Sequence, residues 1–277
     1  MTVHLPVVTS AAKTDFVSAE LVGPDGVILY LDGNQKVSGW DPKPNAFSLV
    51  QIEDCPMSTP TCRASCYVHG LEANAKSVHA LYRHNSKTIR EILASPHAIV
   101  WAHLMADWIT ANAPRIGFRW HVSGDLFSPE YTSWVATVMS WSPSVRHWIY
   151  TRSFSYTASF VGLKNVSVNY SVDKDNHADA LQYVAAHAAC GSPVRMAYLV
   201  TEDGEHPPLP EGSILFPDYN LRGPRGPGVT PSSARLDSPW YQGLDSFARR
   251  MVCPTDFYGK SEGTVCGQCT KCMEPNQ

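Results

Sequence analysis

The chain of 277 residues lacks several features that would place it in a membrane or outside a cell. It has no run of about 18 apolar residues, so the sequence predicts no transmembrane helix and no membrane partner. Residues 1–11 lack a basic segment followed by an apolar one, so no secretory signal is evident and we expect a cytoplasmic protein. No pattern in the chain specifies an oligomeric state.

Charge is also scarce. Charged residues make up 17% of the chain and the net charge is -3, so there is no overall electrostatic attraction to nucleic acid. A local group of basic residues recurs at helical spacing: Arg83, His84, Lys87 and Arg90. A solvated helix surface is our favoured interpretation of this group, and a phosphate-binding surface is the alternative.

Cysteine, by contrast, is plentiful. Eight cysteines in a chain without a secretory signal argue against a disulfide framework. One of them, Cys190, is isolated at the end of a predicted helix, and we interpret it as a buried apolar side chain. The others form two clusters, the first with Cys55, Cys62 and Cys66 and the second with Cys253, Cys266, Cys269 and Cys272.

The first cluster follows the apolar segment 47–52, and Pro56 and Pro60 interrupt any helix there, so we expect a loop that leaves the end of a strand. Its three thiols leave one coordination position open, which favours a catalytic iron–sulfur cluster. His69 could instead fill that position and make the site structural. The second cluster contains a tandem C-x2-C-x2-C, a common iron–sulfur spacing, and zinc is the alternative there.

Short apolar strands alternate with helices between the two clusters. Strands are predicted at 27–31, 118–122, 146–150, 166–170, 194–200 and 214–216, and helices at 73–94, 98–113 and 178–189. One further helix is predicted to begin at Ser128 and Pro129. The alternation predicts an α/β fold with a parallel sheet, and we favour a (β/α) barrel or partial barrel over a doubly wound sheet. Residues 1–250 would form this catalytic domain, and residues 251–277 a four-cysteine metal-binding tail packed on it.

Polar residues follow several of the predicted strands. Ser123, Gly124 and Asp125 come after one strand, Arg152 after the next and Asp173 after a third. A barrel collects such residues around one active site, so Asp125 and Asp173 are candidate catalytic groups. Arg152 is a candidate clamp for an anion or carboxylate, because its guanidinium can donate two parallel hydrogen bonds.

Several spaced motifs together resemble the phage gene product 88 family. They are G-N-x-K at 33–36, F-S-L at 47–49, C-P-x5-C-x3-C-Y at 55–67, S-G-D at 123–125, Y-T-R-S at 150–153, S-V-D at 171–173 and the C-terminal cysteines. The resemblance covers most of the chain. It implies a bacteriophage origin and therefore a location in the host cytoplasm.

More distantly, the order of the motifs is similar to that of radical S-adenosylmethionine enzymes. In those enzymes a strand runs into a loop of three cysteines, and Cys62 and Cys66 match the start of that loop. His69 stands where the third cysteine would be, so Cys55 would be the third ligand. The resemblance implies a 4Fe-4S cluster on these thiols and S-adenosylmethionine bound at residues 123–125.

The same resemblance assigns the substrate to Arg152 and Asp173, and it makes the tail cysteines the ligands of an auxiliary cluster. Our leading hypothesis is thus an iron–sulfur enzyme that modifies a nucleic-acid-derived substrate, a nucleobase or DNA.

Two alternatives remain. Phage 7-deazaguanine DNA transglycosylases are (β/α) barrels with a structural zinc near the C-terminus. A resemblance to them would make Asp173 the nucleophile, Asp125 its partner and the tail cysteines the zinc ligands. The third hypothesis is a non-catalytic, metal-stabilised protein that binds a host factor through two closed zinc sites, with His69 as a ligand of the first.

Overall fold

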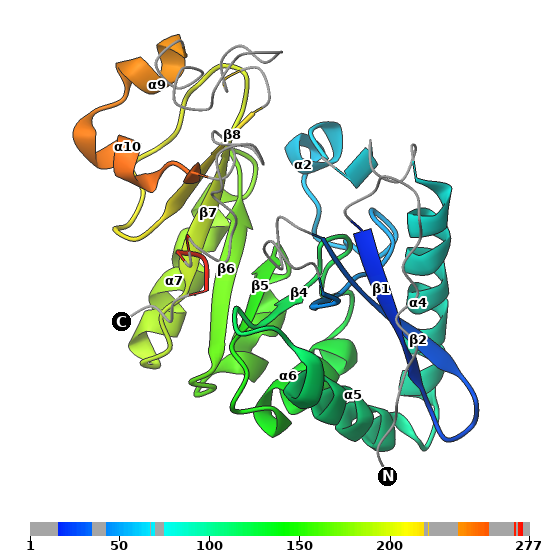
Figure 1. Ribbon diagram of the computed structural model, residues 1–277. Coiled ribbons are helices and arrows are strands. Elements are labelled where there is room, and N and C mark those ends of the chain that lie inside the picture. Colours follow the sequence, from blue (N-terminus) through cyan, green and yellow to red (C-terminus); the bar gives the residue numbers. More distant parts are fainter. Residues whose placement is uncertain are drawn as a thin grey trace.

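The computed structural model describes residues 16–34, 43–66, 68–69, 75–218, 221, 238–254, 269 and 271–273. Its centre is an eight-stranded sheet whose strands lie side by side in chain order (Figure 1). The strands are β1 (Phe16–Val22), β2 (Ile28–Asn34), β3 (Ala46–Phe47), β4 (Phe118–Trp120), β5 (His147–Thr151), β6 (Val166–Val172), β7 (Arg195–Val200) and β8 (Ile214–Pro217). Strands β1, β2 and β3 pair antiparallel, and every pairing from β3 to β8 is parallel.

Helices connect the parallel strands. After β3 come α2 (Pro60–Ala64), α4 (Lys76–Ala94) and α5 (Ala98–Asn112), followed by α6 (Pro129–Trp141), the 3-10 helix η1 (Phe154–Phe160) and α7 (His177–Ala189). Beyond β8 lie α9 (Pro239–Gly243) and α10 (Ser246–Met251). Parallel strands that follow one another in the same direction through right-handed connections place their helices on one face of the sheet. The predicted α/β fold is confirmed, whereas a doubly wound order, which would reverse direction partway, is wrong for the described strands.

The sheet is open, so a closed (β/α) barrel is not formed by the described residues. Both edges of its parallel part are occupied. Strand β2 pairs antiparallel with β3 at one edge. At the other edge Val252 forms a bridge with Leu215 of β8, and the Cys253 amide donates to the Leu215 carbonyl at 2.8 Å. Neither β3 nor β8 therefore presents a free edge for the other to pair with.

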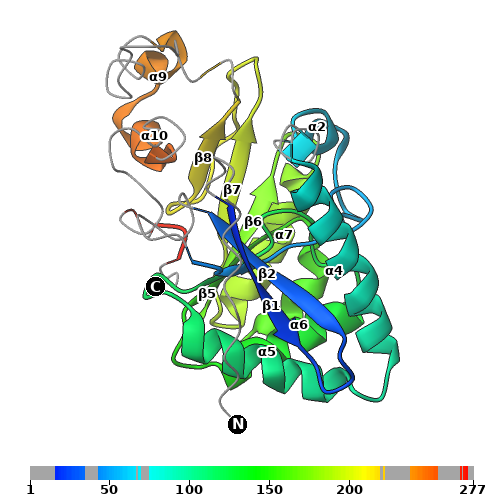
Figure 2. The same cartoon turned by 45° about the vertical axis from the view of Figure 1, so that its right-hand side comes forward.

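The main core lies between the sheet and its helices. On β4, Phe118 and Trp120 point into this core, and Trp101 of α5 is fully buried in it. A smaller cluster lies apart from it and joins Trp148 of β5 to Met273 of the tail. Figure 2 shows the described tail residues, in red, to the left of the strands and α4 to their right. The tail thus packs on the sheet face that the helices leave uncovered.

The capping residue and proline predicted at the start of one helix are found there. The side chain of Ser128 accepts a hydrogen bond from the Tyr131 amide, and Pro129 occupies the first turn of α6, which confirms the predicted start. Cys190, predicted to be buried, is exposed. It ends α7, and Gly191 then turns the chain with a φ of 66°, so the thiol stays at the surface. In the part of the chain that the structure describes, no helix has both the length and the apolar character needed to cross a membrane.

Candidate functional site

The loop after β3 and the residues that follow β4, β5 and β6 meet at one end of the sheet. The Leu49 amide donates to the Ser123 carbonyl at 2.9 Å, and the Asp125 amide donates to the Asp54 carbonyl at 2.9 Å. These two bonds hold the cysteine-bearing loop against residues 123–125. The structure therefore brings the first cysteine cluster beside the Ser-Gly-Asp motif, far from it in sequence.

Asp125 ties the end of β4 to the end of β5. One carboxylate oxygen accepts from the Leu126 amide at 2.7 Å and the other from the Arg152 amide at 2.8 Å. The residue is only 6% exposed. Burial raises the pKa of Asp125, and hydrogen bonds from the Thr151 side chain and from the backbones of Arg152 and Leu126 oppose that shift. Asp125 is thus a buried acid held in a fixed orientation beside Arg152.

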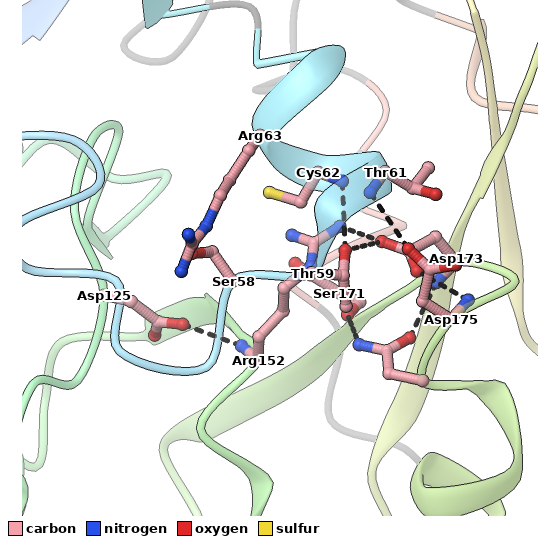
Figure 3. Close-up of polar contacts among 11 residues, drawn as sticks. Ser58, Thr59, Thr61, Cys62, Arg63, Asp125, Arg152, Ser171, Asp173 and Asp175 are labelled. Atoms are coloured by element: carbon pink, nitrogen blue, oxygen red, sulfur yellow. Dashed lines mark hydrogen bonds and ion pairs between the residues drawn. The ribbon is translucent and has the colours of Figure 1, made fainter.

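Asp173 lies at the centre of a second polar network (Figure 3). Its Oδ2 accepts from the Thr59 hydroxyl at 2.6 Å and pairs with Arg152 Nη2 at 3.0 Å, while its Oδ1 accepts from the Asp175 amide at 3.0 Å. The carboxylate is completely buried. Because three donors satisfy it, Asp173 fixes Arg152 and the cysteine loop relative to β6.

Thr59 is the residue through which Asp173 reaches the thiols. Its hydroxyl also accepts from the Cys62 amide at 3.0 Å and so caps α2, whose first residue is Pro60. Asp175 adds a second anchor by accepting from the Thr61 amide at 2.9 Å. Sequence reasoning overlooked Thr59, although a threonine directly before a proline is a helix-start signal that could have identified it.

The three loop thiols lie near one another and near these acids. Burial, the neighbouring Asp125 carboxylate and the thiols of Cys62 and Cys66 together raise the pKa of Cys55 to about 12. Burial also raises the pKa of Cys62, whereas the nearby Arg152 guanidinium opposes the shift. The Cys66 thiol donates to Gln51 Oε1 at 3.3 Å. Burial thus favours the protonated form of the Cys55 and Cys62 thiols unless a cation binds beside them.

The donor types fit a metal centre, since three partly buried thiols belong to one loop. Within the described segments, however, no three His, Cys, Asp or Glu side chains are arranged to hold a single metal ion. Shared ligation by the three cysteines would therefore require their side chains to turn inward. An iron–sulfur cluster, which is larger than a single ion, spreads its ligands further apart. His69 is exposed, and its Nε2 contacts the Arg63 carbonyl at 3.0 Å rather than a thiol.

Unusual backbone conformations border the site. Ile52 and His121 have φ values of 66° and 65° and are the non-glycine residues with positive φ in the described chain. Each belongs to the segment that carries a strand into the site, where strained conformations often have a functional reason. Gly124 has a φ of 81°, and a Cβ there would lie 2.6 Å from the Leu49 Cβ. Only glycine fits at the centre of this motif.

Carboxylates lie beside three of the basic residues of α4. Arg83 pairs with Glu53 at 3.0 Å, and Arg90 pairs with the buried carboxylate of Asp54. Lys87 lies 3.8 Å from Glu91. Each of these three cations therefore has a carboxylate partner, which favours the interpretation of a solvated helix surface. The pair of Arg90 and Asp54 additionally locks the cysteine loop to α4.

A second group of thiols lies on the uncovered face of the sheet. Cys253, Cys269 and Cys272 all interact electrostatically with Lys271. The fourth predicted ligand, Cys266, is outside the described residues.

Comparison with known proteins gives one family. No curated protein and no solved structure matches the chain. The family model described as Gene product 88 matches residues 24–275, which is most of the chain and includes both cysteine clusters, the Ser-Gly-Asp motif and the whole parallel sheet. The protein therefore belongs to the phage-associated Gene product 88 family.

Proposed function

We propose that this protein is a phage metalloenzyme whose loop thiols Cys55, Cys62 and Cys66 hold an iron–sulfur cluster beside a bound S-adenosylmethionine. A nucleic-acid-derived molecule is the proposed substrate. The observation that carries the proposal is the meeting of these thiols with Asp125 and Arg152 at the strand ends. Three thiols from one loop and two fixed ionic groups from neighbouring strands converge on one place.

The order of the elements supports this reaction class. The cysteine loop follows the first parallel strand, and the Ser-Gly-Asp turn follows the second. Radical S-adenosylmethionine enzymes, to which the sequence is similar, place their cluster loop and their amine-binding turn in the same order. We take the parallel strands β3 to β8, with their helices on one face, as a partial (β/α) barrel of this kind.

Each strand-end group has a role consistent with its contacts. A cluster with one iron free of protein ligands supplies an electron to a sulfonium cofactor. Asp125 would accept a hydrogen bond from the cofactor amine, because its two oxygens have four lone-pair sites and receive three donors, the amides of Leu126 and Arg152 and the Thr151 hydroxyl. Arg152, whose buried Nε has no partner in the described structure, would bind an anionic group of the cofactor or substrate. Asp173 and Thr59 would position Arg152 and Cys62.

Aromatic and cationic groups also lie on the uncovered sheet face, where Tyr150 contacts the tail at Cys272. The Arg119 guanidinium lies 5.2 Å from the centre of the Tyr150 ring, and that ring meets Phe216 edge-on at 5.9 Å. The neutralised surface of α4 favours a small nucleotide-derived substrate over a long duplex.

The DNA transglycosylase alternative receives less support from the geometry. Its nucleophile, Asp173, would have to reach a sugar, yet this carboxylate is 0% exposed and is bound by three donors. That alternative also leaves the loop thiols without a role. The metal-stabilised binding protein remains as an outcome of the test below.

The test is anaerobic purification followed by reconstitution with iron and sulfide, with visible absorption and metal analysis of the product. We expect a thiolate-to-iron absorption that is weakened in Cys62→Ser by loss of the loop cluster and unchanged in Cys190→Ser, whose thiol is exposed. With dithionite as reductant, S-adenosylmethionine should be cleaved by the wild type, and at least about 100-fold more slowly by Arg152→Gln.

A colourless protein that binds only zinc would refute the proposed function. Exchange of labelled guanine into DNA would then test the transglycosylase, and two zinc ions with inert Asp125→Ala and Asp173→Ala variants would leave the binding protein.

A further inference from the structure

Two distant segments carry the second group of thiols to the uncovered face of the sheet. Cys253 follows α10 and is fixed to β8 by its amide bond to the Leu215 carbonyl. Cys272 is fixed to β6, where its carbonyl accepts from Asn169 Nδ2 at 3.0 Å. The next carbonyl along the tail accepts from Ser167 Oγ at 2.9 Å. Separate strands therefore hold separate thiols of this group.

The Tyr150 side chain links the two segments. It hydrogen-bonds to the Cys272 thiol and interacts electrostatically with Cys253. Tyr150 belongs to β5, between the strand that leads to Asp125 and the strand that carries Asn169. A phenol beside a thiol is a typical outer-sphere partner of a metal-bound sulfur, because it orients the sulfur and modulates its charge.

Cationic groups surround these thiols. Lys271 interacts with all three and with Arg195, and its Nζ donates to the Arg250 carbonyl. A cavity of about 300 Å³ opens beside Cys253, and its described lining contains Lys271, Arg249 and Arg250 but no carboxylate. Among the described residues the thiols thus face several cations, and such surroundings are suited to a group with net negative charge.

From this juxtaposition we propose that Cys253, Cys269 and Cys272 hold a second, anionic metal–thiolate centre, either an iron–sulfur cluster or zinc. A metal ion bound by three or more thiolates carries a net negative charge, which the surrounding lysine and arginine side chains offset. As with the loop thiols, no three metal-binding side chains of the described residues form a finished ligand set, so the tail would tighten around the metal. The proposal does not depend on Cys266.

The second centre has a structural consequence that is independent of the function proposed for the first. It would join the tail to the segment after α10, and through them β6 to β8. Met273, buried against Trp148 and Val122, would be held in place by the neighbouring metal ligand. The metal thus fastens the tail over the sheet face that the helices leave open.

The experiment measures metal retained per chain after reconstitution with iron and sulfide, and separately with zinc. The variants are Cys269→Ser and Cys272→Ser at the proposed centre, Cys62→Ser at the loop and Cys190→Ser as the control thiol. We expect each tail variant to lose one centre while the loop centre remains, and Cys62→Ser to show the reverse. Limited proteolysis should then cut the tail of Cys269→Ser about 10-fold faster or more, whereas Cys190→Ser stays resistant.

A charge variant tests the same centre without removing a ligand. Lys271→Gln keeps every thiol, and we expect metal transfer to a chelator from this variant to be about 10-fold faster. Lys87→Gln, on the exposed surface of α4, is the matched control and should behave as the wild type.

Unchanged metal content and unchanged proteolysis in both tail variants would overturn the proposal. If the loop centre persists in that result, the proposed function stands and only the second centre fails. Loss of metal in Cys62→Ser, with none in the tail variants, would also leave the proposed function standing and refute the second centre. A protein that binds neither iron nor zinc would refute both the proposed function and the second centre.

Discussion

Thr59 offers the sharpest test of how the site is held together, because one hydroxyl makes two bonds of different kinds. It accepts from the Cys62 amide at 3.0 Å and donates to the buried Asp173 carboxylate at 2.6 Å. Thr59→Val keeps the shape of the side chain and removes both bonds. Loss of a helix cap costs about 1 kcal/mol, and loss of a hydrogen bond to a charged group costs about 2 kcal/mol.

We therefore expect Thr59→Val to lower the free energy of unfolding by about 3 kcal/mol, which corresponds to a fall in Tm of about 6 °C for a chain of this size. Chemical denaturation followed by tryptophan fluorescence measures the change. The matched control is Ser128→Ala, which removes a cap of the same geometry on α6 whose carboxylate partner, Glu130, is exposed rather than buried, and it should cost only about 1 kcal/mol. Thr59→Ser retains the hydroxyl and should lie within about 1 kcal/mol of the wild type.

Comparing the losses in Thr59→Val and Ser128→Ala shows whether the bond from Thr59 to Asp173 contributes to stability. If Thr59→Val and Ser128→Ala differ by less than about 0.5 kcal/mol, the bond from Thr59 to Asp173 adds no stability and the positioning role of this network is wrong. If they differ by about 2 kcal/mol, reactivity of the Cys62 thiol toward an alkylating reagent should also rise in Thr59→Val. The helix that carries Cys62 then loses both its cap and its anchor on β6.

Three further predictions follow from contacts at and around the site. Gly124→Ala should lower the free energy of unfolding by about 3 kcal/mol, because the new side chain adds positive-φ strain and steric overlap. The control Gly162→Ala also has a positive φ, of 85°, but open space around it, and should cost about 1 kcal/mol. Equal losses in the two variants would show that steric overlap does not contribute. Arg90→Gln should lower the free energy of unfolding by about 3 kcal/mol, because it leaves the buried carboxylate of Asp54 without its cation. Arg83→Gln, which breaks an exposed pair, should lower it by less than about 1 kcal/mol. Thermal melts compare the two variants, and a small loss for both would show that the buried pair is dispensable. Burial raises the pKa of Asp32 from 3.8 to about 6. Between these pH values the folded protein retains a proton that the unfolded chain releases. The free energy of unfolding should therefore fall by up to about 3 kcal/mol as the pH rises from 4 to 6. Asp32→Asn should remove that loss, and a variant whose stability keeps the wild-type pH dependence would place the titration elsewhere.

Much of the architecture could be predicted from local patterns. Alternating strands and helices gave the α/β fold, and Ser128 with Pro129 marked the start of α6. Such signals lie within a few neighbouring residues, because caps and apolar periodicity depend on local backbone geometry. The spaced cysteine, Ser-Gly-Asp and Ser-Val-Asp motifs were also sufficient to identify the family.

Other features were decided by packing between distant parts of the chain. The sheet is open because β2 and Val252 occupy the edges that closure would need, and no local pattern specifies which segments reach those edges. Cys190 illustrates the same limit, since its exposure follows from where the end of α7 lies in the fold.

The sequence by itself identified the candidate site residues, namely the thiols and the polar groups that follow the strands. Only the tertiary structure decided how those groups are placed relative to one another. Asp173 lies 114 positions from Thr59 in the chain, yet their bond fixes the cysteine loop, and the same carboxylate is too fully bound to remain an obvious nucleophile. A hydrogen bond over that separation exists only because the parallel strands end at one edge of the sheet, which brings their loops into contact.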